Sequence, residues 1–355
     1  MRKIKAIAYG LGNLGRGLIR PALEKGVEFV GAIDINPDLI GRDLGAVAGL
    51  QRDLGIAISG DAAQVLAETS ADVVLMNLSS GARQIHPQVR DCLRAGINVI
   101  TSSNDLVYPW THAPEISALI DTQARKHDVS VVSSGATDAL VVNMLSTLAG
   151  ACHQLKTIEV GARVSLNEVS AKELLSFGVG CAPETVSQML SGFGEAPLLR
   201  TALESVARDL GLTPTRFENI FDPVVAKRDM YVPKHDLHVK AGTAKGLESR
   251  VFIETQEGIS LSGTVRHELF PKGKHEAGGL AVNLKGQPDI SVVLDDLEVR
   301  DMARFQIINR IPDVISAAPG LISTEQLCRP KYRARGLGSY LSEISAGKGI
   351  CEIMH

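Results

Sequence analysis

The chain has 355 residues, of which 45% are hydrophobic and 22% charged, and a formal net charge of −3. This length exceeds the roughly 250–300 residues at which a single hydrophobic core stops growing, so we expect two domains. Charges of both signs are mixed throughout, which excludes an extended basic face and argues against nucleic acid or an anionic membrane as a partner.

The segment MRKIKAIAYG has too short an apolar run for a signal peptide, and no later segment approaches the roughly 18 apolar residues of a membrane span. The five cysteines are scattered without CxxC spacing, which is typical of reduced thiols rather than of a disulfide framework. We therefore expect a cytoplasmic protein. No metal site is predicted, because only two close histidines, His235 and His238, suggest one and a third ligand is missing.

Short β-branched runs alternate with segments of helix length in the first part of the chain, at residues 4–10, 27–34, 71–77, 97–103 and 129–135. This alternation is typical of βαβ units and predicts a parallel sheet. We expect a Rossmann-type domain over residues 1–140.

The pattern changes after this region to longer alternating strands, at residues 155–166 and 249–270, with a polar loop at 271–279. Such alternation predicts a half-exposed antiparallel sheet. The fold class is therefore α/β, with a second, α+β domain over residues 141–310. Residues 299–317 predict a helix ending near Pro312 or soon after, and residues 311–355 predict a tail that packs back on the body.

The first predicted strand ends in GLGNLG, where the glycines are followed by a predicted helix. Such a turn brings the backbone close to a pyrophosphate, and the free N–H groups of the helix start bind phosphate. The motif alone is weak, but its position between a strand and a helix favours dinucleotide binding. The predicted cofactor-binding residues of this turn are Gly10, Gly12, Asn13, Leu14 and Gly15.

Asp34 ends the second predicted strand, 19 residues after Gly15 (34 − 15). A carboxylate at this position accepts hydrogen bonds from the ribose hydroxyls of NAD and repels the 2′-phosphate of NADP. The prediction is NAD, with NADP still possible because Arg16 or Arg42 would pair with a phosphate. The alternative is a solvent-facing aspartate at an ordinary turn.

Three later predicted strands end in polar residues, and the carboxyl ends of parallel strands meet at one edge of a sheet. We expect these loops to line the active site, because a hydride acceptor must be held by several strand ends. The alternative is helix capping by Ser, Asn and Asp, which is the expected role of Asp138. The predicted cofactor contacts in these loops are Ser79, Ser80, Ser102 and Gly135.

Five segments together resemble the 2,4-diaminopentanoate dehydrogenases and the native amine dehydrogenases related to them, which share a dihydrodipicolinate-reductase-like N-terminal domain. They are residues 9–15, 30–45, 95–110, 148–160 and 308–323. The resemblance implies an NAD(P)-dependent enzyme that aminates a ketone reductively or deaminates a primary amine. It also implies a homodimer joined through the C-terminal domain, and it places Asn309 against the cofactor domain.

The chain departs from this family where the chemistry is expected. Asn104 and Asp105 replace a Glu pair, residues 136–138 replace an Asn-Pro-Gly turn, and a basic stretch is replaced at residues 163–175. Reductive amination needs a group that exchanges protons and favours an iminium. An amide such as Asn104 only orients a substrate, whereas Asp105 exchanges a proton if it turns inward.

Two further residues are catalytic candidates. His267 lies on an alternating strand of the second domain, where a surface position is the alternative, and Tyr108 is either a proton donor or part of an aromatic wedge with Trp110. Three function hypotheses remain open at this point. They are an amine dehydrogenase, an NAD(P)-linked reductase of a cyclic imine or another polar carbonyl or hydroxy substrate, and a non-catalytic dinucleotide sensor.

Overall fold

The computed structural model describes residues 2–78, 81–191, 198–270 and 278–345. The chain forms two compact units. The first contains the residues up to Asn143 together with those from Arg300 onward, and the second contains Met144–Val299. The sequence placed these boundaries at residues 140 and 310, so residues 300–310 lie in a different unit from the one expected. Ser79, Ser80 and most of the polar loop at 271–279 lie outside the described residues.

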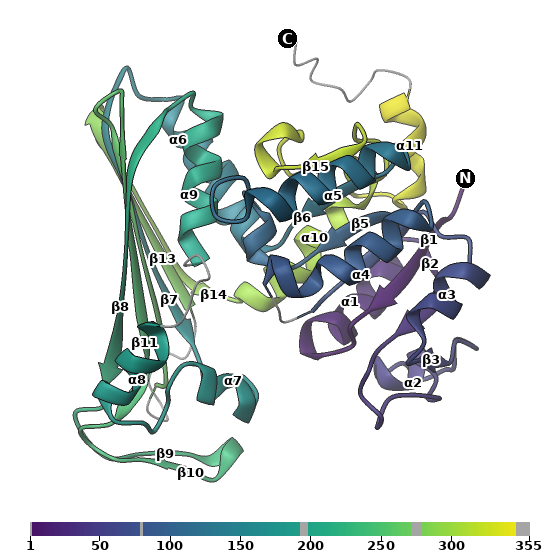
Figure 1. Cartoon of the computed structure of the whole chain (residues 1–355), viewed down its shortest axis with the longest axis horizontal. Coiled ribbons are helices and arrows are strands. Elements are labelled where there is room, and N and C mark those ends of the chain that lie inside the picture. Colours follow the sequence, from purple (N-terminus) through teal and green to yellow (C-terminus); the bar gives the residue numbers. More distant parts are fainter. Residues whose placement is uncertain (1, 79–80, 192–197, 271–277, 346–355) are drawn as a thin grey trace. The chain divides into compact units, whose positions relative to one another are not determined.

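The first unit is built on a seven-stranded sheet with strand order β15-β6-β5-β4-β1-β2-β3 (Figure 1). All neighbouring strands pair in parallel, as the sequence predicted. The strands are β1 Ile4–Tyr9, β2 Val27–Ile33, β3 Ile58–Ser59, β4 Val73–Met76, β5 Asn98–Thr101, β6 Ser130–Ser133 and β15 Gly320–Ile322.

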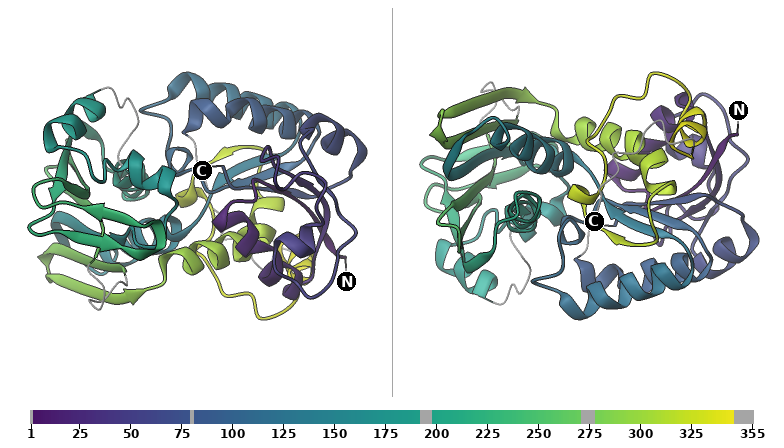
Figure 2. Two further views of the ribbon diagram at one scale, coloured as in Figure 1. Left: turned by 90° about the horizontal axis from the view of Figure 1, so that it is seen from below. Right: turned by 90° about the horizontal axis from the view of Figure 1, so that it is seen from above.

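Helices cover both faces of this sheet, which is why its strands are apolar on both sides (Figure 2). Helices α1, α2, α10 and α11 pack on one face together with Ile4 and Ala6, and α3, α4 and α5 pack on the other with Ile7 and Tyr9. The helices are α1 Asn13–Glu24, α2 Leu44–Val47, α3 Ala62–Glu68, α4 Ala82–Arg94, α5 Pro114–Lys126, α10 Val299–Ile315 and α11 Gly338–Ser345.

The last part of the chain completes the first unit. Strand β15 pairs in parallel with β6, and Leu337 and Leu341 reach the core beside α1 and α10. A π-helical segment, Asp138–Asn143, follows β6 and leads to the second unit. Residues 138–143 thus lie next to the unit boundary in sequence. In space they contact helix α10, which comes near the end of the chain.

The second unit is built on a six-stranded sheet with strand order β14-β13-β7-β12-β11-β8. Its pairs are antiparallel except for β7 with β12, so the prediction of a largely antiparallel sheet is confirmed. Strands β9 and β10 form a separate hairpin. The strands are β7 Gln154–Ser165, β8 Pro214–Val225, β9 Met230–Val232, β10 Leu237–Val239, β11 Ala244–Thr255, β12 Ser260–Glu268, β13 Gly278–Gln287 and β14 Ile290–Leu297.

Helix α9 covers one face of this sheet. At Gly263 of β12 a side chain would come within 2.8 Å of Leu199, so glycine allows the helix to approach closely. The opposite face leaves Phe252 and Val293 exposed. The helices of this unit are α6 Met144–Ala149, α7 Ala171–Ser176, α8 Pro183–Ser191 and α9 Leu198–Asp209. None of the described helices is long and apolar enough to cross a membrane.

Candidate functional site

The glycine turn between β1 and α1 is packed as a nucleotide-binding turn requires. Gly10 has φ of 84°, a conformation that favours glycine. At Gly15 an added Cβ would lie 1.9 Å from the Gly10 carbonyl oxygen, so the helix start packs directly on the turn. Gly12 is the N-cap of α1 and supplies no side chain to the first N–H groups of the helix.

Gly12 faces open space, unlike its two partners in the motif. An added Cβ at Gly12 would meet no atom of the residues that the structure describes within 4 Å. The helix start therefore has room beside it for an anion, where N–H groups and the helix dipole favour a phosphate. The residues of this turn fit the pyrophosphate of a dinucleotide.

Arg304 of α10 supports the same turn, a contact that the sequence analysis missed. Its Nη2 donates to the Asn13 carbonyl oxygen at 2.7 Å, and an added Cβ at Gly17 would lie 2.2 Å from its Nε. The Asn13 side chain accepts from Arg16 at 2.8 Å, and Leu14 packs against the core. No local pattern reveals Arg304, because it is 291 residues away from Asn13 in sequence.

Asp34 lies beside the glycine turn at the end of β2. One carboxylate oxygen accepts from the Leu11 N–H at 2.5 Å, and the other accepts from the Asn36 N–H at 2.8 Å. The carboxylate is half-buried and fixed by backbone groups on both sides. Its position next to the turn is the one expected for a group that binds the adenosine ribose.

Asp105, after β5, holds the start of another helix. Its Oδ2 accepts from the Ala82 N–H at 3.1 Å, and Ala82 is the first residue of α4. The N-cap of α4 is Gly81, which has no side chain to make this bond. Burial raises the pKa of the Asp105 carboxyl, and the bond from Ala82 partly opposes this rise. The carboxylate is therefore engaged in a cap across 23 residues.

Asn104 is exposed and joins the ends of β5 and β6. Its Oδ1 accepts from the Thr137 hydroxyl at 3.2 Å. Ser102 and Tyr108 are half-buried in the same segment, and the Trp110 ring packs against the core beneath. The structure thus brings two of the three predicted polar strand ends together.

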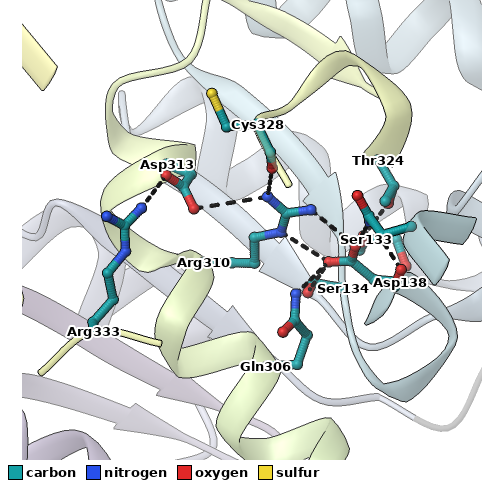
Figure 3. A network of polar contacts seen from close by, with 10 residues as sticks. Ser133, Ser134, Asp138, Gln306, Arg310, Asp313, Thr324, Cys328 and Arg333 are labelled. Atoms are coloured by element: carbon teal, nitrogen blue, oxygen red, sulfur yellow. Dashed lines mark hydrogen bonds and ion pairs between the residues drawn. The ribbon is translucent and has the colours of Figure 1, made fainter. Parts of the chain in front are cut away.

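Asp138, one residue after Thr137, is fully buried and paired with Arg310 of α10 (Figure 3). The prediction that Asp138 caps a helix was wrong, because its carboxylate accepts from the side chains of Ser134, Gln306, Arg310 and Asn143. Burial alone would lower the pKa of Arg310, but the charge of Asp138 raises it. An ion pair at this depth needs such complete hydrogen bonding to offset its lost hydration.

The remaining predicted residues have other surroundings. Asn309 Oδ1 accepts from the Arg333 N–H at 3.3 Å, so its amide contacts the C-terminal segment. Gly135 has ordinary packing, since a Cβ would lie 3.8 Å from Ala303. His267, in the second unit, stacks on Phe177 with ring centroids 4.7 Å apart. Burial lowers the pKa of His267 to about 4, so its imidazole is neutral at pH 7 and weaker as a base than an ordinary histidine.

Comparison with known proteins assigns the family. Residues 137–337 match the model of the 2,4-diaminopentanoate dehydrogenase C-terminal domain. The chain belongs to the 2,4-diaminopentanoate dehydrogenase family, as its resemblance predicted, and it is an oxidoreductase.

Two relatives cover nearly the whole chain. The chain is 26% identical to a 2,4-diaminopentanoate dehydrogenase of Acetoanaerobium sticklandii, over 93% of this chain and 95% of the relative. The structure of an amine dehydrogenase from Mycobacterium smegmatis is 29% identical with a TM-score of 0.89, over 94% of this chain and 98% of the other. Both relatives are dehydrogenases that act on small molecules, which supports dehydrogenase activity for this chain.

More distant similarity extends to the fold alone. An oxidoreductase from Agrobacterium radiobacter, solved with NAD+, L-tartaric acid and magnesium, is 12% identical with a TM-score of 0.56. The similarity covers 98% of this chain and 96% of the other. The two-unit architecture is therefore shared well beyond the family.

The open space at Gly12 leads to a first prediction. Gly12→Val should abolish binding of NADH and NADPH, because the added side chain would occupy the space beside the α1 N-terminus, where its Cβ meets no atom of the described residues within 4 Å. Fluorescence titration of both cofactors measures the affinity, and thermal unfolding checks that the fold is intact. Gly15→Val is the matched control, since its clash with Gly10 should lower thermal stability. Unchanged dinucleotide affinity in a folded Gly12→Val variant would contradict the site.

Proposed function

We propose that the chain is an NAD(P)-dependent oxidoreductase of the amine dehydrogenase type, which aminates a ketone reductively or deaminates a primary amine oxidatively. The observation that carries the proposal is the uncapped glycine turn with open space at Gly12, in a chain whose relatives include an amine dehydrogenase. The joined ends of β5 and β6 lie at the carboxyl edge of the same sheet, where ligands of parallel sheets bind.

The proposed cofactor is NAD, with NADP as the alternative. Asp34 supports this preference because its fixed carboxylate would accept hydrogen bonds from ribose hydroxyls and repel a 2′-phosphate. Gly10, Gly12 and Gly15 shape the pyrophosphate site, and Arg304 supports it from α10 through the Asn13 carbonyl. When bound, the nicotinamide ring supplies or accepts the hydride.

The residues at the ends of β5 and β6 would orient the substrate rather than exchange its proton. The Asn104 amide forms hydrogen bonds but does not titrate near neutral pH. The Asp105 carboxylate is held at the start of α4. Because Asn104 is exposed, we assign proton exchange to water at this edge, with Tyr108 as the next titratable side chain along the chain after Asp105.

A second candidate function is reduction of a cyclic imine or a polar carbonyl without ammonia. The amide at position 104 favours it, since an amide N–H stabilises negative charge that develops on a carbonyl oxygen during hydride addition. The reaction consumes NAD(P)H and one proton from water, and it yields a cyclic amine from the imine or an alcohol from the carbonyl. Ammonia dependence separates the two functions.

We also propose that the enzyme is a homodimer joined through the open face of the six-stranded sheet. This face carries exposed Phe252 and a shallow hollow that is lined by exposed Val293 and by several small residues. Charges of both signs border the hollow, which suits a symmetric contact between identical surfaces. The residues of the hollow are Gly161, Ala162, Arg163, Glu248, Thr264, Arg266, Gly279, Leu280, Ala281, Val293 and Asp295.

The role of Asp34 is tested by cofactor preference. Asp34→Ser should weaken NADH binding more than NADPH binding and shift their affinity ratio by roughly tenfold, equivalent to about 1.4 kcal/mol. Asp34→Asn is the control, because it keeps an oxygen for the Leu11 N–H while removing the charge. Titration of both cofactors measures the ratio. Equal losses for NADH and NADPH in both variants would place Asp34 away from the ribose.

The reaction type is tested by NADH oxidation over a panel of ketones, aldehydes and cyclic imines, with and without ammonium. Amine dehydrogenase activity requires ammonium for ketone turnover, and equal turnover without it would support the second function instead. Asn104→Glu should raise ammonium-dependent turnover by roughly 10²–10⁴, the effect of a fixed acid–base group. Asn104→Gln has the same length without the charge and should give no such increase.

The dimer is tested by the mass in solution. Val293→Arg should convert the dimer to a monomer, because it places a like charge on both copies of the symmetric contact. Leu119→Arg is the control, since Leu119 is an exposed apolar residue on α5 of the first unit. Light scattering after size-exclusion chromatography measures both masses. A monomeric parent protein, or a Val293→Arg variant that remains dimeric, would refute the proposed contact.

A further inference from the structure

The carboxylate of Asp138 accepts hydrogen bonds from four different side chains. It accepts from Ser134 Oγ at 2.8 Å, from Gln306 Nε2 at 2.9 Å, from Arg310 Nε and Nη2 at 2.9 Å each, and from Asn143 Nδ2 at 2.8 Å. Asp138 and Arg310 are both 0% exposed. These bonds fix the whole segment from the end of β6 through the π-helix against α10.

The network continues into the C-terminal segment (Figure 3). Arg310 Nη1 donates to the Cys328 carbonyl, and it lies 3.7 Å from Asp313 Oδ2. Arg333 pairs with the other oxygen of Asp313 at 2.5 Å. Three parts of the chain that are distant in sequence therefore meet at Arg310.

The end of β6 is held from a second direction as well. Thr324, just after β15, donates to the Ser133 carbonyl at 3.3 Å, and the Ser133 hydroxyl donates to the Ser103 carbonyl at 2.7 Å. Ser103 directly precedes Asn104. The loops after β5 and β6 are thus tied to each other and to the C-terminal segment, on the buried side of the sheet edge.

Thr137 lies between this buried network and the exposed edge. It is one residue before Asp138, and its hydroxyl donates to Asn104 Oδ1 at 3.2 Å. A threonine hydroxyl that donates to an amide oxygen restricts the orientations of that amide. A displacement of Asp138 would therefore move Thr137 and rotate Asn104.

A role in stability alone explains this arrangement poorly. Apolar residues of similar volume often replace a buried ion pair without loss of stability, because desolvation offsets the attraction between the charges. In some proteins buried polar groups are retained because they define a single geometry. Here the buried contacts of Asp138 define the conformation of the loop after β6, which lies at the sheet edge where we propose that the substrate binds.

We propose that Thr137 is a positioning residue for Asn104, and that the buried pair of Asp138 and Arg310 holds Thr137 in place for catalysis. The inference rests on the proposed function, in that the substrate is taken to bind at the ends of β5 and β6. Asp138 and Arg310 touch neither substrate nor cofactor; they act through Thr137.

The first test compares two substitutions of Thr137 in the full-length enzyme. Thr137→Val removes the hydroxyl and should lower kcat roughly tenfold or more on a substrate accepted in the panel, since small misplacements at a reacting centre cost up to about 10²-fold. NADH affinity should stay unchanged. Thr137→Ser retains the hydroxyl and should restore kcat to near the parent value. Equal kcat in the two variants would overturn the role of Thr137.

The second test measures hydrogen–deuterium exchange of residues 134–143 in the NADH-bound enzyme, and it needs no turnover. Gln306→Leu removes one bond to Asp138, and Asp138→Asn removes its charge. Both variants should speed exchange in this segment and lower kcat. Arg200→Lys is the matched control, since Arg200 pairs at 2.9 Å with buried Glu204 of α9, in the second unit. It should change neither quantity.

The outcomes separate the inference from the proposed function. If no panel substrate is turned over, the proposed function fails. Faster exchange in Gln306→Leu then still supports the ordering of residues 134–143 by the network, and unchanged exchange overturns it. If the parent enzyme turns over a substrate and Gln306→Leu speeds exchange without lowering kcat, the network is structural only. If neither quantity differs from that of Arg200→Lys, the network does not hold this segment. If Asp138→Asn does not fold, the decision rests on Gln306→Leu and on the Thr137 pair.

Discussion

The buried pair of Asp138 and Arg310 is the interaction on which the arrangement of the first unit depends. Removing two charges from water is costly, and the cost is offset only when their hydrogen bonds are complete and their positions fixed. Asp138 follows β6, and Arg310 lies on α10, 172 residues later. Satisfying this pair requires α10 and the C-terminal segment to pack on the parallel sheet, which brings β15 beside β6. The pair therefore constrains how the end of the chain closes the domain.

Helix α10 connects this constraint to the cofactor site. Arg304 lies against the glycine turn through the Asn13 carbonyl, while Gln306 and Arg310 hold Asp138 beyond β6. The apolar side chains of the helix pack in the core between these contacts. One rigid helix thus contacts the proposed pyrophosphate end and the proposed substrate end of the site. A structural change at either end of the site would therefore shift helix α10, which is packed in the core, rather than a flexible loop.

The sequence predicted the parts of the site whose contacts are close in sequence, and it missed those whose contacts are distant in sequence. The placement of the glycine turn beside Asp34 was predictable because it depends on a strand, a turn and a helix that are close in sequence. Their role in cofactor binding stays a prediction. Asp105 was predicted as a proton-exchange candidate, with helix capping as the alternative. Which helix it caps could not be read from the sequence, because Ala82 lies on a different segment. Arg310 carried one signal, a charge within the apolar run around Ile307 to Val314, but its partner cannot be read from spacing.

The same contacts define the electrostatic character of the proposed substrate site. The charge of Asp138 is balanced by Arg310, and the carboxylate of Asp105 lies at the positive end of the α4 dipole. Asn104, where the family resemblance implies a glutamate, is neutral. In the loops directly after β5 and β6, the carboxylates of Asp105 and Asp138 are thus both engaged in contacts within the protein. Selectivity at this edge would then depend on the direction of hydrogen bonds, which is why the orientation of the Asn104 amide by Thr137 matters more here than it would beside a catalytic carboxylate.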